Sequence, residues 1–133
     1  MIKSAGGKFI APQKIEALLK QSDFISNVHI HGDQQKYVVA LLTLDTQATK
    51  HFAEAHDISY KDFSSLVVNP KIRERVHELV SEANSHLASY ETVKNFEILD
   101  HEFSIENGEL TPSLKVKRKF VDEKYKNLIE AMY

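Results

Sequence analysis

Three stretches of the chain carry the hydrophobic pattern of strands. Residues 28–31 and 95–98 alternate apolar and polar side chains. Because successive side chains of a strand point to opposite faces, this period of two predicts two strands with one apolar face each. Residues 37–44 are apolar almost throughout, which predicts a strand buried on both faces. The polar turn at 32–36 predicts that the first two strands along the chain pair as an antiparallel hairpin.

The remaining apolar residues recur at the spacing of helices. The strongest helix is predicted from residues 69–70, because Asn caps a helix and Pro suits the first helical position. Pro12 opens another helix in the same way, and Asp45 is a cap for a third. We expect a short helical turn at 60–66 and a last helix after Pro112. The apolar face of this last helix is expected to comprise Val121, Tyr125, Leu128 and Met132.

At the N-terminus, residues 2–4 and 9–11 are short extended pieces on either side of Gly6 and Gly7, which predicts a hairpin. The fold class that follows is α/β in the α+β sense. We expect a small mixed sheet of about three strands with packed helices, plus the short N-terminal hairpin. No repeat or Pro/Gly-rich linker divides the chain, so residues 1–133 are expected to form a single domain.

Composition narrows the possible functions. With 42% hydrophobic and 27% charged residues the chain is typical of globular proteins. A net charge of −2 provides no overall field that attracts nucleic acid, so we expect no nucleic-acid partner. The absence of Cys excludes disulfides, thiolate metal ligands and a Cys nucleophile. The longest apolar run is too short to span a bilayer and no signal peptide is recognisable, so a cytoplasmic location is expected.

The basic run Lys115–Lys119 is the first candidate for chemistry. It has three interpretations: a solvated helix start, an anion site for phosphate or carboxylate, and, ranked below both, a nucleic-acid patch. Basic residues oppose the dipole at the start of a helix, which favours a functional role.

The second candidate is the loop 4–8, Ser-Ala-Gly-Gly-Lys. It is either a tight hairpin or a place where the backbone approaches a ligand closely, which Gly permits. It is not a phosphate-binding P-loop, because the required first Gly and the Ser or Thr after the Lys are absent.

The seven histidines invite a search for metal ligands. His29 and His31 would share a strand face, and His51 and His56 lie near one helix. No further ligand stands at a recognisable spacing from either pair. We therefore expect histidines on polar surfaces and no metal site.

Two stretches resemble the C-terminal domain of adenylate-forming enzymes, specifically of long-chain fatty acid–CoA ligases. Residues 2–12, Ile-Lys-Ser-Ala-Gly-Gly-Lys-Phe-Ile-Ala-Pro, followed by Ile15 and Glu16, resemble the loop just after the hinge between two domains. Residues 106–118, Glu-Asn-Gly-Glu-Leu-Thr-Pro-Ser-Leu-Lys-Val-Lys-Arg, resemble the motif that holds the catalytic lysine. With both motifs in this order, the resemblance covers essentially the whole chain.

The resemblance implies a two-step reaction. ATP, with Mg²⁺, and a fatty acid form an acyl-adenylate and pyrophosphate, and the thiol of coenzyme A then displaces AMP. The small domain acts as a rotating lid. Lys115 is implied to be the adenylation lysine, and chemistry supports this role because an ammonium can bridge the carboxylate and the nucleotide oxygens.

The resemblance also implies roles for the N-terminal loop. Gly6 and Gly7 would lie beside the pantetheine channel of coenzyme A, with Lys8 near one of its phosphates or a carbonyl. Lys3 is similar in position to a second lysine near the adenylate. The basic tail Lys117–Lys119 would support contacts between domains.

The large domain that binds ATP and the acyl chain lies outside these residues. We therefore expect the chain to be one part of a longer enzyme, inactive alone and without a bound cofactor, with Met1 not the start of that enzyme. Its partner would be its own N-terminal large domain, and any peripheral membrane contact would be made through that domain. The alternative is a free-standing small α/β module that binds an anionic ligand or a partner protein.

Overall fold

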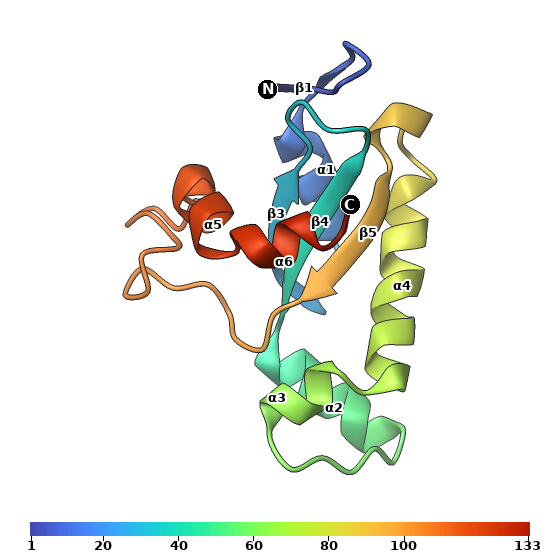
Figure 1. The fold of residues 1–133 in the computed structure, drawn as a ribbon. Coiled ribbons are helices and arrows are strands. Elements are labelled where there is room, and N and C mark those ends of the chain that lie inside the picture. Colours follow the sequence, from blue (N-terminus) through green and yellow to red (C-terminus); the bar gives the residue numbers. More distant parts are fainter.

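The computed structural model describes all residues from Met1 to Tyr133 (Figure 1). In chain order the elements are β1 (Ile2–Lys3), β2 (Phe9–Ile10), α1 (Pro12–Leu19), β3 (Ile25–His31), β4 (Val38–Leu44), α2 (Thr46–Ala55), α3 (Phe63–Val67), α4 (Pro70–Asn84), a 3₁₀ turn (Ser89–Glu91), β5 (Val93–Ile98), α5 (Arg118–Lys124) and α6 (Lys126–Glu130). The predicted α/β fold class is confirmed.

The sheet has three strands in the order β3-β4-β5. β3 and β4 form the predicted antiparallel hairpin, whereas β4 and β5 run parallel, so the sheet is mixed. All seven residues of the central strand β4 are buried, as its apolar sequence predicts. β1 and β2 form the separate N-terminal hairpin, with Ile2 opposite Ile10.

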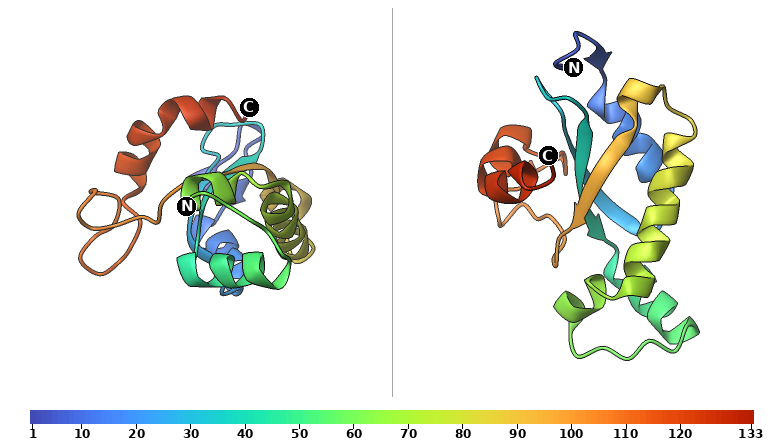
Figure 2. Two further views of the ribbon diagram at one scale, coloured as in Figure 1. Left: turned by 90° about the horizontal axis from the view of Figure 1, so that it is seen from below. Right: turned by 45° about the vertical axis from the view of Figure 1, so that its right-hand side comes forward.

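The two faces of the sheet carry two different cores. Alternate residues of β4, such as Ala40 and Leu42, pack with α1 and α4 in the larger core. Val39 and Leu41 point to the other face and pack with residues of α5, α6 and the loop before them. Figure 2 shows α5 and α6, in red, on the opposite side of the sheet from α1 and α4. The segment after β5 is therefore the sole cover of the second face.

Side-chain caps start the helices where the sequence predicts them. Asp45 accepts a hydrogen bond from the backbone N–H of Ala48 at 2.9 Å at the start of α2. Asn69 accepts one from the N–H of Lys71 at 2.9 Å ahead of α4, which has Pro70 at its first position. Such caps satisfy N–H groups that have no partner within the helix. None of the helices combines the length and apolar character that crossing a membrane requires.

The prediction of one continuous last helix is wrong. The chain leaves helical geometry at Tyr125, with φ −108° and ψ 22°, and this residue separates α5 from α6. The Tyr125 hydroxyl donates a hydrogen bond to the carboxylate of Glu109, a tertiary contact that helical periodicity does not register. The predicted apolar face is nevertheless present, because Val121 and Met132 are buried and Tyr125 and Leu128 pack against the second core.

Candidate functional site

Lys115 lies on a narrow loop between β5 and α5. Leu110 and Val116 pair across this loop as an isolated antiparallel bridge. The Thr111 N–H donates to the Lys115 carbonyl at 2.8 Å, and Leu114 at the tip has a positive φ of 65°. A side chain disfavours this left-handed conformation, so the neighbouring hydrogen bonds must hold it in place.

The Lys115 side chain is exposed and forms no ion pair. Its neighbour Leu114 is 64% exposed, which is unusual for a large apolar residue. Both line an open pocket of about 420 Å³ beside α1, together with Glu16 and Lys20. The loop thus presents an ammonium and an apolar group to whatever lies outside the domain.

One end of the loop is anchored by Arg118, the first residue of α5. Its guanidinium donates two hydrogen bonds to the Glu16 carboxylate of α1, at 2.8 and 2.6 Å. The same carboxylate accepts a hydrogen bond from the Ile30 N–H of β3 at 3.3 Å. Paired bonds of this kind fix orientation as well as distance. The ion pair thus gives Arg118 a role within this domain, beside the contacts between domains that the resemblance implies.

The other end is anchored by Glu109, whose side chain is fully buried. Its carboxylate accepts hydrogen bonds from Lys124 at 3.1 Å and from the Tyr125 hydroxyl. His101 Nε2 lies 3.3 Å from the same carboxylate, and the Ser104 N–H donates to it at 3.3 Å. Because an unpaired buried carboxylate is costly, this set of partners fixes the start of the loop 110–117 that bears Lys115, here called the lysine loop. Sequence reasoning missed Glu109, since nothing in its local pattern distinguishes it from an exposed residue.

The contacts among Glu109, His101 and Tyr125 determine how these three side chains ionise. Burial opposes ionisation of Glu109, but hydrogen bonds from Tyr125, Lys124 and His101 outweigh it and hold the pKa of the carboxyl below its usual value. Burial alone would lower the pKa of His101. Hydrogen bonds to Asp100 and Glu109 outweigh that effect and raise it. Burial and the bond to Glu109 raise the pKa of the Tyr125 hydroxyl. The cluster therefore favours an anionic Glu109 beside a protonated His101.

The second candidate loop is the turn between β1 and β2. The Gly7 N–H donates to the Ser4 carbonyl at 2.9 Å, and Ser4 Oγ accepts from the Lys8 N–H at 3.1 Å. Gly7 has a φ of 82°, so the turn requires a residue without a side chain there. Gly6 does not have a positive φ, and a Cβ added to it meets nothing closer than 3.9 Å. The fold therefore explains Gly7 as a hairpin glycine and leaves Gly6 without a structural requirement.

Lys3 and Lys8 flank this turn and are both exposed. The Lys3 ammonium lies 5.5 Å from the centre of the Phe9 ring, and that of Lys8 lies 5.6 Å from the Tyr90 ring. Neither lysine is in an ion pair, so both charges remain available to an anion.

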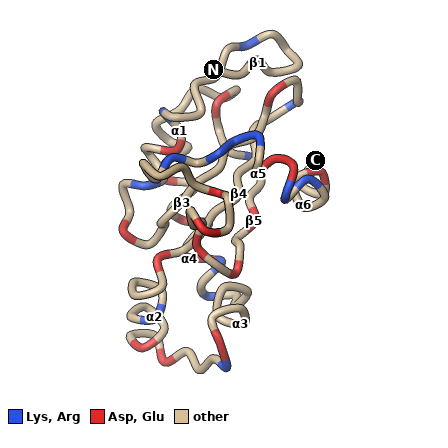
Figure 3. Tube along the Cα trace, turned by 90° about the vertical axis from the view of Figure 1, so that its left-hand side faces the viewer, with Lys and Arg blue, Asp and Glu red and all other residues tan.

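The two loops lie on different parts of the molecule. The N-terminal hairpin projects above α1, whereas the loop that bears Lys115 extends from the side of the sheet (Figure 1). Figure 3 shows Lys and Arg gathered along the stretch 115–119, away from the N-terminal hairpin. The structure does not bring Lys115 together with Gly6, Gly7 or Lys8, and it offers two separate surfaces.

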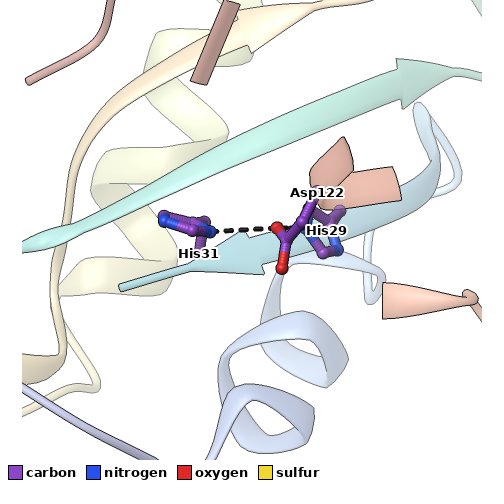
Figure 4. Close-up of side chains that lie close together, drawn as sticks. All are labelled: His29, His31 and Asp122. Carbon is purple, nitrogen blue, oxygen red and sulfur yellow. Dashed lines mark hydrogen bonds and ion pairs between the residues drawn. The ribbon is translucent and has the colours of Figure 1, made fainter. Parts of the chain in front are cut away.

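The histidines of β3 share a strand face, as the sequence predicts, but that face is not a polar surface throughout. The prediction that they lie on a polar surface is wrong for His29, which is 1% exposed, because α5 covers this face of the strand. His29 Nε2 and His31 Nδ1 lie 2.7 and 2.9 Å from the same oxygen of Asp122 (Figure 4). His51 and His56 are exposed.

Comparison with known proteins agrees with this architecture. A family model described as AMP-binding enzyme C-terminal domain matches residues 1–133. The whole chain is 34% identical to 22% of the long-chain-fatty-acid–CoA ligase FadD15 of Mycobacterium tuberculosis, and 32% identical to 19% of the human long-chain-fatty-acid–CoA ligase 6. The chain thus spans about a fifth of the length of these relatives.

Solved structures point the same way. The fold is similar to part of the A-PCP didomain of carboxylic acid reductase from Segniliparus rugosus in complex with AMP, with a TM-score of 0.73 and 25% identity over 98% of this chain and 17% of that one. The fatty acyl CoA synthetase of Mycobacterium tuberculosis shares the fold at a TM-score of 0.57 and 16% identity, over 96% of this chain and 20% of that one.

The mixed sheet, the N-terminal hairpin and the lysine loop together form a domain of the kind that this family model describes. The chain belongs to the family of AMP-binding enzyme C-terminal domains. Its homologues include long-chain fatty acid–CoA ligases from bacteria, plants and animals. The resemblance found in the two sequence motifs is therefore confirmed.

Proposed function

We propose that this chain is the lid domain of an ATP-dependent long-chain fatty acid–CoA ligase. It supplies Lys115 to the adenylation step and, after rotation, contributes the loop around Gly6 to the coenzyme A channel. A large N-terminal domain of the same enzyme binds ATP with Mg²⁺ and the fatty acid, and it makes any contact with a membrane. The enzyme acts in the cytoplasm.

The observation that carries the proposal is that the charge of Lys115 is exposed and has no ion-pair partner. Its ammonium is exposed and unpaired, while Arg118 and Glu109 anchor the loop on both sides. Attack of a carboxylate on the α-phosphate brings two anionic groups together. A positive charge that has no ion-pair partner within the domain and is held on a fixed loop lowers this barrier without first breaking an ion pair.

The positions of the two loops support a lid that presents a different surface in each of the two steps. A lid that serves two steps needs two surfaces, and the lysine loop and the N-terminal hairpin project from different parts of the domain (Figure 1). Gly6 has open space where a side chain would stand, although the hairpin does not require a glycine there. A glycine at position 6 is accounted for if it leaves room for pantetheine. The nearby Lys8, which forms no ion pair, is suited to a phosphate of coenzyme A.

The first test uses the complete enzyme with Lys115→Ala. Fatty-acid-dependent pyrophosphate release should fall at least about 10²–10³-fold, because a charge partner of the transition state is lost. Thioester formation from supplied acyl-adenylate should change little. Lys61→Ala is the matched control, since Lys61 is also exposed but lies outside this basic run. Unchanged pyrophosphate release in Lys115→Ala would reject the lid role and favour a free-standing module that binds an anionic ligand.

The second test addresses the N-terminal loop. Gly6→Leu should slow thioester formation from acyl-adenylate and leave pyrophosphate release nearly unchanged. Gly6→Ala is the graded control, because its small side chain has room in this domain. If Gly6→Leu instead slows both steps equally, the assignment of this loop to the coenzyme A step is wrong.

A further inference from the structure

The face of the sheet beneath α5 carries a polar cluster that the adenylation chemistry does not use. His29 and His31 stand two residues apart on β3 and point to the same side, and Asp122 reaches them from α5 (Figure 4). We propose that these three residues form a binding site for a divalent transition-metal cation, with Zn²⁺ as the best fit. The site is independent of the proposed ligase function.

The ligand set matches the chemistry of such a cation. Two imidazole nitrogens and a carboxylate oxygen lie within 4.8 Å of one another. Imidazole suits Zn²⁺ and its neighbours, whereas Mg²⁺ and Ca²⁺ prefer oxygen alone. Metal–ligand distances of about 2.0–2.2 Å place neighbouring tetrahedral ligands about 3.4 Å apart. The nitrogens now lie 2.7 and 2.9 Å from the Asp122 oxygen, so an outward movement of this oxygen by less than about 1 Å brings both distances to that value. The two nitrogens themselves lie no more than 4.8 Å apart.

The burial of His29 indicates that packing alone does not account for the polar residues on this face. His29 and His31 lie opposite Leu41 and Val39 of β4, which belong to the second hydrophobic core. His29 is 1% exposed, and its Nδ1 has no hydrogen-bond partner. An apolar side chain at this position would bury more favourably, since buried polar atoms without partners are costly and rare. A polar pair kept on an apolar face therefore indicates a function that needs imidazole.

The cluster is also accessible from one side. His31 and Asp122 line a pocket of about 270 Å³ together with Lys126, Glu130 and Tyr133. The His31 and Asp122 side chains are 23% and 39% exposed, so a cation can arrive from solvent. Three protein ligands leave a fourth tetrahedral position facing this pocket for a water molecule. A bound ion would join β3 to α5, the helix that directly follows the lysine loop.

The test is calorimetric titration of the folded 133-residue chain with Zn²⁺. The wild type should bind one ion, and Co²⁺ in its place should give the absorption of a tetrahedral site with nitrogen and oxygen ligands. His31→Gln and Asp122→Asn should each weaken Zn²⁺ binding at least about tenfold. Excess Mg²⁺ should not compete. We choose these two positions because they are partly exposed, whereas a change at buried His29 risks unfolding; circular dichroism verifies the fold of each variant.

His86→Gln is the matched control. His86 lies 3.5 Å from Glu82 on α4, and both side chains are largely exposed. This variant should bind Zn²⁺ as the wild type does. Absence of Zn²⁺ binding by the wild type would overturn the proposal, as would equal binding by folded His31→Gln and Asp122→Asn. In either case the cluster serves only to hold α5 against β3 through hydrogen bonds.

Discussion

Arg118 and Glu16, separated by 102 residues in the sequence, meet in a two-bond ion pair. The pair joins the first residue of α5 to the middle of α1, on opposite sides of the sheet edge formed by β3. Glu16 also accepts a hydrogen bond from the β3 backbone, so three elements converge on one carboxylate. The position of the lysine loop thus depends on a residue near the other end of the chain.

Breaking this pair should destabilise the domain measurably. Arg118→Gln is expected to lower the free energy of unfolding by about 2 kcal/mol, because a partly buried carboxylate loses its charged donor. Urea denaturation measures this. Arg75→Gln, which removes an exposed pair with Glu78 on α4, should cost less than about 1 kcal/mol. A double-mutant cycle with Glu16→Gln should show coupling between Arg118 and Glu16, and additive effects would contradict the direct pairing.

The buried Glu109 should matter more than its exposed neighbour. Glu109→Gln leaves the Lys124 ammonium without its carboxylate partner and is expected to cost about 2–3 kcal/mol. The Lys117 N–H, which donates to the Glu109 carbonyl, should exchange with solvent faster. Hydrogen exchange and urea denaturation measure the two effects. Glu106→Gln, at an exposed residue of the same loop, should change neither, and a similar effect there would argue against an anchoring role for Glu109.

The stability of the domain should depend on the charge of His101. Folding raises the pKa of His101 above 6.5, so its protonated form favours the folded state. That contribution is complete below pH 6.5 and is lost as the pH rises through the folded pKa. The difference in unfolding free energy between the wild type and His101→Gln should therefore shrink above pH 6.5. His51→Gln, at an exposed residue outside the cluster, should show no such trend. If the difference in unfolding free energy instead grows with pH, the folded state does not raise the pKa of His101.

The left-handed conformation of Leu114 predicts a stabilising change. Leu114→Gly removes the conflict between the Cβ and a φ of 65°, and the largely exposed side chain contributes little packing. The gain in unfolding free energy should be about 0.5–1 kcal/mol. Ser113→Gly, at the preceding residue with an ordinary φ, should instead reduce stability. Thermal unfolding of both variants measures these changes in stability. If Leu114→Gly destabilises as well, its side chain contributes more packing than its exposure indicates.

Much of the fold follows from local sequence. The period of two around Val28 and Phe96, the apolar run of β4 and the caps at Asp45 and Asn69 all lead to the observed elements. The break at Tyr125 does not; this residue makes a hydrogen bond to Glu109, and hydrophobic periodicity does not record such a contact. The mixed sheet was predicted, but its parallel pair, β4 with β5, is visible only in the structure.

Some residues of the candidate sites can likewise be predicted from the sequence, and others are visible only in the structure. Lys115 stands out in sequence because its motif is contiguous, and the structure finds it exposed. Asp122 could not be assigned to the histidines of β3, since 91 residues separate it from His31 and only the packing of α5 on the sheet brings them together. Metal-site spacing rules describe ligands close in sequence, and they do not detect a site closed by a distant helix.

The dependence of the second core on the segment after β5 has a consequence for biosynthesis. As the polypeptide leaves the ribosome, β4 emerges long before α5 and α6, so Val39 and Leu41 remain uncovered until translation of this domain is nearly complete. A transcript that stops short of these helices would yield a product with an exposed apolar sheet face, a feature that promotes aggregation and proteolytic removal. The ion pairs that anchor the lysine loop involve residues of α5, so they form equally late, and an incomplete product would also lack a positioned Lys115.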